Sequence, residues 1–223
     1  MNFYTGHLRL FCLAIALVGG VAAQAQSSDY SPPNRKTEVF GGFSTVGLKP
    51  GHVDEQDYSR IRLNGWTASY TTYQFFRRWG LTAEFSGNYG TPTIDPPPAG
   101  SVPSFALRSR NHTYLFGGTY RSFERRRLAL TGRILAGATH WSPAAVEVAS
   151  PSPALLAATG VFEPQTAFTF GFGQSIDWKL SEAVAVRVQP DLRFVRIKDV
   201  GGDHRINLQL PFSIGLVYKF GDR

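Results

Sequence analysis

The chain has 223 residues, of which 43% are hydrophobic, 13% aromatic and 17% charged, and its formal net charge is +7 at pH 7. Soluble domains carry about 25% charged residues, so this composition argues against an ordinary cytosolic protein. The length fits one domain, or at most two small ones.

The first 25 residues have the features of a secretory signal peptide. Arg9 provides the positive start, an apolar run follows over residues 10–21, and the sequence AQA at 23–25 matches the small-x-small site of a signal peptidase. We therefore expect the mature chain to begin at Gln26. A cut there removes Cys12, the only cysteine, so neither disulfides nor thiol chemistry are expected.

Two other interpretations of this segment are weaker. An uncleaved membrane helix is disfavoured because Gly19 and Gly20 interrupt a run that is too short to span comfortably. Lipoprotein processing at Cys12 would need a small residue where Phe11 stands. We expect a periplasmic segment at 26–36, one folded domain at 37–220 and a tail at 221–223.

Strict alternation of apolar and polar residues dominates the chain from residue 37 onward. In its clearest case, every even position from Leu208 to Phe220 is apolar or aromatic. Such residues would scatter around a helix but form one face of a strand. Alternation predicts eight strands, at 37–47, 62–75, 81–89, 112–121, 128–141, 168–179, 184–194 and 208–220.

The connections between these strands alternate between short and long. Short turns are predicted at 76–79, 122–127 and 180–182, and long links at 48–61, 90–111, 142–166 and 195–206. Most of the 14 prolines lie in the long links, as expected for a residue that removes a ladder donor. Pro190 and Pro211 lie inside predicted strands, so we expect a bulge or irregularity at each.

The size of the side chains decides which face looks outward. One face carries mostly Phe, Leu, Val, Tyr and Trp, and the other mostly small, polar and charged residues. The interior of an eight-stranded barrel has room only for side-chain filling, so the bulky face should look outward, into lipid. In hydrocarbon an open sheet edge would leave backbone groups unpaired, so the sheet should close.

The sequence therefore predicts an all-β fold, an eight-stranded antiparallel up-and-down transmembrane β-barrel with both termini on the periplasmic side. Its aromatic girdles would be formed by Trp66, Trp79, Trp141, Trp178, Tyr218 and Phe220. A soluble exported sandwich or a lipocalin-like barrel is the alternative.

Four segments resemble a known family. They are EVFGGF at 38–43, LNGW at 63–66, GLTAEFSG at 80–87 and GLVYKF at 215–220. In this order they resemble the OmpA-like superfamily of eight-stranded outer-membrane barrels, over about residues 37–220.

The resemblance implies location in the cell outer membrane and recognition of the aromatic last strand by the outer-membrane assembly machinery. The chain departs from the family pattern because residues 221–223 follow Phe220, where a terminal Phe is usual. No peptidoglycan-binding domain follows the predicted barrel, so we do not expect wall anchoring.

Charged residues on the predicted inner face form the first candidate site. They are Glu84, Arg133, Asp177, Arg187, Asp191 and Arg193, with Lys179 and Lys219 near the short turns. Isolated charges in a narrow lumen would be costly, so we expect pairing, for example between Asp177 and Arg187, which should lie diagonally on adjacent strands. This network is a plug or a gated ion path, and we favour the plug because interiors of this size are usually filled.

Arginines near the long links form the second candidate site: Arg60, Arg62, Arg108, Arg110 and Arg205. Guanidinium groups suit phosphate, so we hypothesise contacts with lipopolysaccharide phosphate; simple solvated charges are the alternative. The arginines at 77–78 and 125–127 should lie in solvated turns. Nucleic-acid binding does not fit an exported chain of this kind.

The remaining polar residues give weaker signals. The histidines His52, His112, His140 and His204 lie in or near the long links, and His140 with Ser142 suggests a lipid A-modifying enzyme, although no carboxylate is placed to orient them. No cluster has the spacing of metal ligands, and we expect neither cofactor nor metal.

We therefore expect an outer-membrane protein with a structural or surface-interaction role and no catalytic activity, in contact with outer-membrane lipid and lipopolysaccharide. A narrow channel for ions or small solutes is the first alternative, and a lipid A-modifying enzyme is the second. The mobile exterior links expected at 90–111 and 142–166 would carry any extracellular binding, but their sequence names no ligand.

Overall fold

The computed structural model describes residues 37–48, 61–73, 78–94, 105–145, 164–198 and 204–221. The predicted signal peptide, the segment 26–36 and residues 222–223 lie outside these ranges. The described chain consists of strands: β1 (Thr37–Leu48), β2 (Ile61–Thr72), β3 (Trp79–Gly90), β4 (Thr93–Ile94), β5 (Phe105–Glu124), β6 (Leu128–Ala145), β7 (Gln165–Lys179), β8 (Val184–Lys198) and β9 (His204–Phe220).

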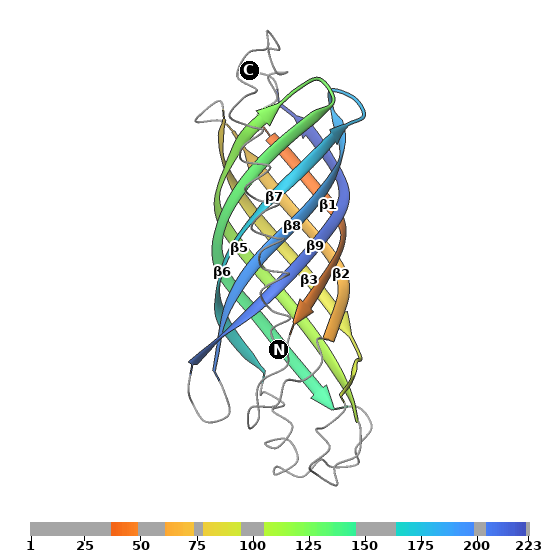
Figure 1. The fold of residues 1–223 in the computed structure, drawn as a ribbon, viewed down its shortest axis with the longest axis vertical. Helices are drawn as coiled ribbons and strands as arrows, with labels where there is room; N and C mark the ends of the chain where they lie inside the picture. The colour runs from red at the N-terminus through yellow and green to blue at the C-terminus, as the bar shows by residue number, and fades with distance from the viewer. Residues whose placement is uncertain are drawn as a thin grey trace, which may run out of the picture.

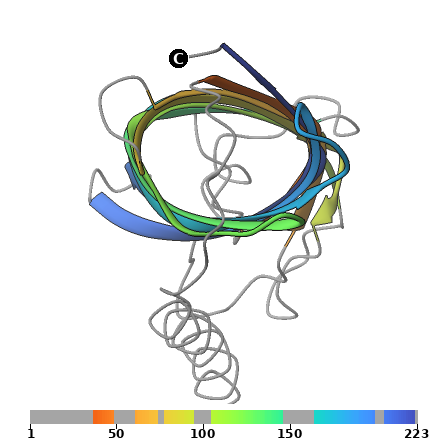
Figure 2. The same ribbon diagram turned by 90° about the horizontal axis from the view of Figure 1, so that it is seen from above.

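Eight of these strands form a closed antiparallel barrel (Figures 1 and 2). Each long strand pairs with the next one along the chain, and β1 pairs with β9 to close the ring. The predicted fold class is confirmed. The two-residue strand β4, which pairs with β5 beside the barrel wall, was not predicted.

The register sets the tilt of the strands. A row of paired residues that leaves β9 at Leu216 passes Gly41, Ala68, Phe85, Tyr114, Ala138, Phe168 and Arg196 and returns to β9 at Ile206. The displacement is ten residues, 216 − 206. A stagger of this size in eight strands requires the tilted strands seen in Figure 1.

A pair of glycines lets the closing seam form. Gly42 of β1 and Gly215 of β9 face each other across the seam. A Cβ on Gly42 would stand 2.3 Å from the backbone oxygen of Ile214, and one on Gly215 would stand 2.2 Å from that of Gly41. The backbones of the first and last strands can approach this closely only because neither residue has a side chain.

The predicted strand boundaries were wrong at the end with the long links. β5 begins at Phe105 rather than 112, β6 continues to Ala145, and the 195–206 link is largely strand. The outward residues there, such as Arg110 and His140, are polar. The apolar alternation therefore ends before the hydrogen-bonded ladder does, and a prediction based on hydropathy stops too early.

Pro190 and Pro211 lie beside gaps in the ladder that do not shift its register. Around Pro190, β7–β8 pairing is missing between Asp191 and Val188, and β8–β9 pairing resumes only at Arg193. The irregularities expected at Pro190 and Pro211 are therefore gaps. A shift of register falls elsewhere, between Arg121 and Phe123 of β5, so β5 continues into the segment predicted as a turn and ends at Glu124.

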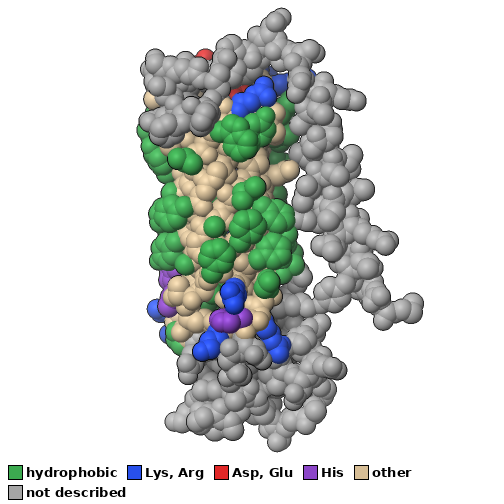
Figure 3. All heavy atoms as spheres, turned by 90° about the vertical axis from the view of Figure 1, so that its left-hand side faces the viewer, with side chains coloured by type: hydrophobic (Ala, Val, Ile, Leu, Met, Phe, Trp, Pro, Cys, Tyr) green, Lys and Arg blue, Asp and Glu red, His purple; other side chains and the backbone are tan. Residues whose placement is uncertain are grey.

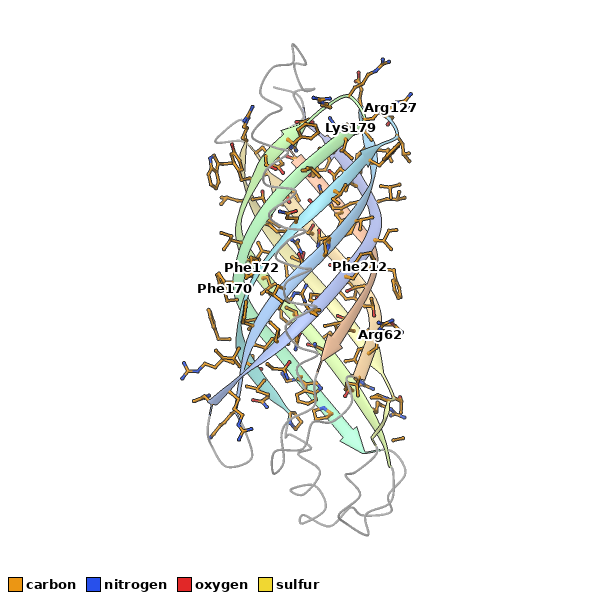
Figure 4. All side chains as sticks on the ribbon, in the orientation of Figure 1. Arg62, Arg127, Phe170, Phe172, Lys179 and Phe212 are labelled. Atoms are coloured by element: carbon orange, nitrogen blue, oxygen red, sulfur yellow. The ribbon has the colours of Figure 1, made fainter. Side chains whose placement is uncertain are left out.

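The outer wall carries a broad apolar band (Figure 3). The side chains of Trp79, Trp178, Trp66, Tyr218 and Phe220 all lie on this outer wall and are exposed. Figure 4 shows Phe170, Phe172 and Phe212 at middle height, Arg127 and Lys179 at the end with the short turns, and Arg62 toward the opposite end. These are referred to below as the short-turn end and the long-link end.

Trp141 was wrongly assigned to a girdle. Its side chain is only 9% exposed and clusters with Ala167, Val195 and Ile197 inside the barrel. Trp141 shares the odd-numbered, inward face of β6 with Arg133. The assignment to a girdle used position near a strand end and overlooked this parity.

Candidate functional site

Carboxylates of the described residues are concentrated inside the barrel. Five of the six, Glu38, Glu84, Glu124, Asp177 and Asp191, form salt bridges there with arginine or lysine side chains. The sixth, Glu182, is exposed in the β7–β8 turn. Two separate clusters result.

The first cluster lies toward the short-turn end and is centred on Glu38 of β1. Glu38 accepts bonds from Arg121 of β5 and from Arg187 of β8, the latter at 2.7 Å, and Lys219 Nζ lies 3.2 Å from its Oε1. Arg187 also donates two hydrogen bonds to Asp177, from Nε to Oδ1 at 2.6 Å and from Nη2 to Oδ2 at 2.9 Å. One carboxylate therefore connects β1 to three other strands.

The same cluster extends to the end of the lumen. Arg121 donates to Glu124 at 3.1 Å, and Lys179 of β7 donates to Glu124 at 2.6 Å. The guanidinium of Arg121 also stands 4.2 Å from the centre of the Tyr73 ring. Four cations thus meet three carboxylates across the short-turn end.

The second cluster lies nearer the middle and is centred on Glu84 and Arg133. Arg133 of β6 donates to Glu84 of β3 and, through two nitrogens, to Asp191 of β8. Arg193 donates to Glu84 Oε1 at 2.8 Å, and Gln189 donates to its Oε2 at 3.1 Å. These bonds cross the lumen, because β3, β6 and β8 are not neighbours in the sheet.

The structure brings all six predicted lumen residues into these clusters, all buried. Glu84, Arg133, Asp191 and Arg193 share the middle cluster, and Asp177 and Arg187 belong to the short-turn cluster. Asp177 and Arg187 are direct cross-strand partners rather than the predicted diagonal pair.

Three members of the short-turn cluster were missed: Glu38, Arg121 and Glu124. Glu38 shares its inward face with Phe40, which is 1% exposed and hides the polar pattern of that face. Arg121 and Glu124 lie three residues apart but both contribute to the lumen, because the register shift after Arg121 changes the parity. The alternation of inward and outward residues along β5 is the one sequence signal that could have placed Arg121 on the inner face.

Between the middle cluster and the long-link end, the lumen changes character. Thr139 shares hydroxyl contacts with Thr113 at 3.1 Å and Thr169 at 2.7 Å. Beyond them, the inward side chains include Trp141 and Ile197 and line a small pocket together with Thr139, Gln165, Ala167, Val195, Asn207 and Gln209. This apolar lining was not expected, because the inner face was predicted to carry mostly small, polar and charged residues.

Three of the predicted rim arginines lie on the outer wall, apart from the lumen. Arg62, Arg108 and Arg110 are exposed on the outer wall near the long-link end, Arg205 is exposed at the start of β9, and Arg60 lies outside the described residues. Arg196 and Lys198 of β8 are exposed on the same wall, where a link had been predicted. Figure 3 shows basic and histidine side chains gathered at this end.

The pair His140 and Ser142 lies on the outer face of β6. His140 Nδ1 is 2.9 Å from the hydroxyl of Thr166. Ser142 is the cross-strand partner of Arg110 on β5. Over the described ranges, no outward carboxylate lies at this end, and no group of three or more His, Cys, Asp and Glu side chains could hold a metal.

Known structures share this architecture. OprG from Pseudomonas aeruginosa matches with a TM-score of 0.55 and 12% identity over 85% of this chain and 98% of that one. Neisserial surface protein A matches with a TM-score of 0.54 and 8% identity over 82% and 97%. Ail, the attachment invasion locus protein of Yersinia pestis, matches with a TM-score of 0.50 and 12% identity over 84% and 99%.

The fold is that of the eight-stranded outer-membrane β-barrels. At these identities the likeness concerns architecture alone. No family model matches the sequence, and neither does any curated protein. The described part of the chain contains no helix with the length and apolarity needed to cross a bilayer.

Proposed function

We propose that this protein is an outer-membrane barrel with a sealed lumen and a structural or surface-interaction role. The observation that supports the proposal most directly is the pair of ion clusters that crosses the lumen. Arg133 joins Glu84 to Asp191 across the middle, and Glu38 is joined to Arg121 and Arg187 toward the short-turn end. All six side chains are buried.

The energetics favour a permanent plug over a gate. Removing one partner from a buried ion pair leaves an uncompensated charge and costs about 3–5 kcal/mol. A path through the lumen would require several such bonds to break together. The outward apolar band, which includes Ile134 and Leu216 at about 60% exposure, supports residence in a lipid bilayer.

Conductance in planar bilayers tests the sealed lumen. The purified wild-type barrel should insert without steady channels. A variant in which serine replaces the crossing side chains of both clusters should conduct if it still folds, because small side chains and water would then fill the lumen at both levels. The replaced residues are Glu84, Arg133, Asp191 and Arg193 in the middle cluster and Glu38, Arg121, Asp177 and Arg187 toward the short-turn end. Steady wild-type channels whose selectivity changes in Arg187→Gln or Asp191→Asn would instead support the channel alternative.

We propose that the exposed cations of the outer wall contact lipopolysaccharide phosphate. Arg62, Arg108, Arg110 and Arg196 form no salt bridge within the described ranges. Each guanidinium group presents five N–H donors in a fixed planar arrangement that matches the oxygens of a phosphate. Replacing Arg62, Arg108 and Arg110 with glutamine should lower the lipopolysaccharide that co-purifies with the barrel, whereas glutamine at Arg125 and Arg126, at the other end, should not.

Unchanged co-purification after the three rim substitutions would contradict this contact. The lipid A from the same cells also tests the absence of catalysis. Its mass should be the same with wild-type protein, with His140→Ala and with an empty vector. A mass change that needs His140 would support the enzyme alternative.

A further inference from the structure

Two histidines face each other on the outer wall near the long-link end. His112 of β5 and His140 of β6 are direct cross-strand partners. Both side chains lie on the outward face and are partly exposed. Directly opposite residues in an antiparallel pair have Cβ atoms about 4.5–5.5 Å apart, so the two imidazole rings are within reach of one shared ion.

Each ring is held on the side away from its partner. His112 Nε2 lies 3.0 Å from the hydroxyl of Tyr89 on β3, the strand on the other side of β5. His140 Nδ1 lies 2.9 Å from the hydroxyl of Thr166 on β7, the strand on the other side of β6. These contacts leave His112 Nδ1 and His140 Nε2 as the ring nitrogens available for another ligand.

Such contacts are what metal-binding histidines use. A ring that donates one N–H to an oxygen acceptor presents the lone pair of its other nitrogen, and that bond fixes both tautomer and orientation. Tyr89 and Thr166 are suitable acceptors because a hydroxyl oxygen accepts as well as donates. The edge-on packing of the Tyr89 ring against His112, with centres 5.5 Å apart, further restricts that imidazole.

We propose that His112 Nδ1 and His140 Nε2 chelate one divalent transition-metal ion, with solvent completing its coordination. Metal–nitrogen distances of about 2.0–2.1 Å place the two nitrogens about 3 Å apart, which the cross-strand spacing permits. Imidazole suits copper, nickel and zinc, and Cu²⁺ binds most tightly of these. The site would be open and exchangeable, since no third His, Cys, Asp or Glu of the described residues joins it.

The charges around the two histidines indicate which ligand would compete with a metal ion. Arg110 lies two residues from His112 on the same face, opposite Ser142, and no described carboxylate is nearby. Positive charge weakens cation binding and favours an anion such as phosphate on protonated histidines. The two ligands respond to acid in opposite directions, because protons compete with a metal for the ring nitrogens but strengthen the hold on an anion.

Copper titration of the full barrel tests the proposal. The protein is folded in detergent free of lipopolysaccharide and stripped with a chelator, and Cu²⁺ binding is followed by calorimetry and electron paramagnetic resonance. We expect one Cu²⁺ site per chain with two imidazole nitrogens in its spectrum, lost in His112→Asn and in His140→Asn. His204→Asn, on the same rim, is the matched control and should keep the site.

The supporting hydroxyls provide a second readout. Tyr89→Phe and Thr166→Val should each weaken Cu²⁺ binding by about 10–100-fold, as loss of outer-shell partners does. Each variant is first checked for the mobility shift of a folded barrel, so that loss of binding is not loss of fold. The proposal is overturned if the double variant of His112 and His140 binds Cu²⁺ as wild type does, if His204→Asn abolishes the site, or if only inorganic phosphate binds the pair, more tightly in acid.

Discussion

Single residues decide how the interior is held together, and Glu38 is the clearest example. Glu38 is only 1% exposed. Its carboxylate is bound by Arg121, Arg187 and Lys219, which come from three other strands. One of these strands, β9, also forms the closing seam with β1. Glu38 therefore brings the two ends of the sheet and its far wall into one network.

Replacement of Glu38 should be strongly destabilising. Glu38→Gln keeps the shape but leaves three cations without their shared anion, so we expect a loss of about 3–5 kcal/mol in the free energy of unfolding. Urea unfolding of the barrel in lipid vesicles measures it. Glu182→Gln, at an exposed turn, is the control and should stay within about 0.5 kcal/mol. A Glu38→Gln barrel as stable as this control would show that the cluster adds little.

The two faces of a single strand differ in exposure. Along β9, Ser213 is 1% exposed inside the lumen, whereas Ile214, the next residue, is 44% exposed on the outer wall. Outward residues of the same strand also differ in depth. Ile214 lies near the middle of β9, and Ile206 is the third residue of the strand, at the long-link end.

Depth along β9 should control the cost of an outward charge. Ile214→Arg should lower stability by about 2–4 kcal/mol, because it places a guanidinium near the middle of the apolar band. Ile206→Arg, on the same face near the rim, should cost about 0–1 kcal/mol. Both are measured by denaturant unfolding in vesicles. Equal costs at the two positions would mean that the band does not lie in lipid as we place it.

For the whole molecule, closure of the ring is the decisive property. Pairing of β1 with β9 leaves no free edge among the eight long strands, and buried ion pairs tie the wall across the lumen. Such a barrel can unfold only by breaking many bonds together, so it should resist detergent until it is heated.

Fractionation and gel mobility test the molecule as a whole. The protein should partition with the outer-membrane fraction, and the unboiled sample in dodecyl sulfate should migrate differently from the boiled one. The band should move to the position of the unfolded chain only after heating. Recovery of folded protein from the soluble periplasm without detergent would contradict the membrane assignment.

Much of the architecture could be predicted from local pattern. The residues of β9 alternate strictly, so their strand and its two faces follow from a period of two. The inward position of Arg133, Arg187 and Arg193 followed from the same parity. Boundaries could not be predicted equally well, because the ladder continues past the apolar band into polar positions such as Arg110 and His140.

What the sequence by itself determined is the class of fold and the face of most side chains, because alternation is a local property that each strand carries alone. The partners of those side chains were decided only by the tertiary structure. Glu38 meets Arg187 149 residues away, and Trp141 turns inward onto Val195 and Ile197. These contacts depend on the ten-residue stagger of the closed ring. The stagger is a property of all eight strands together, and the sequence of any one strand does not specify it.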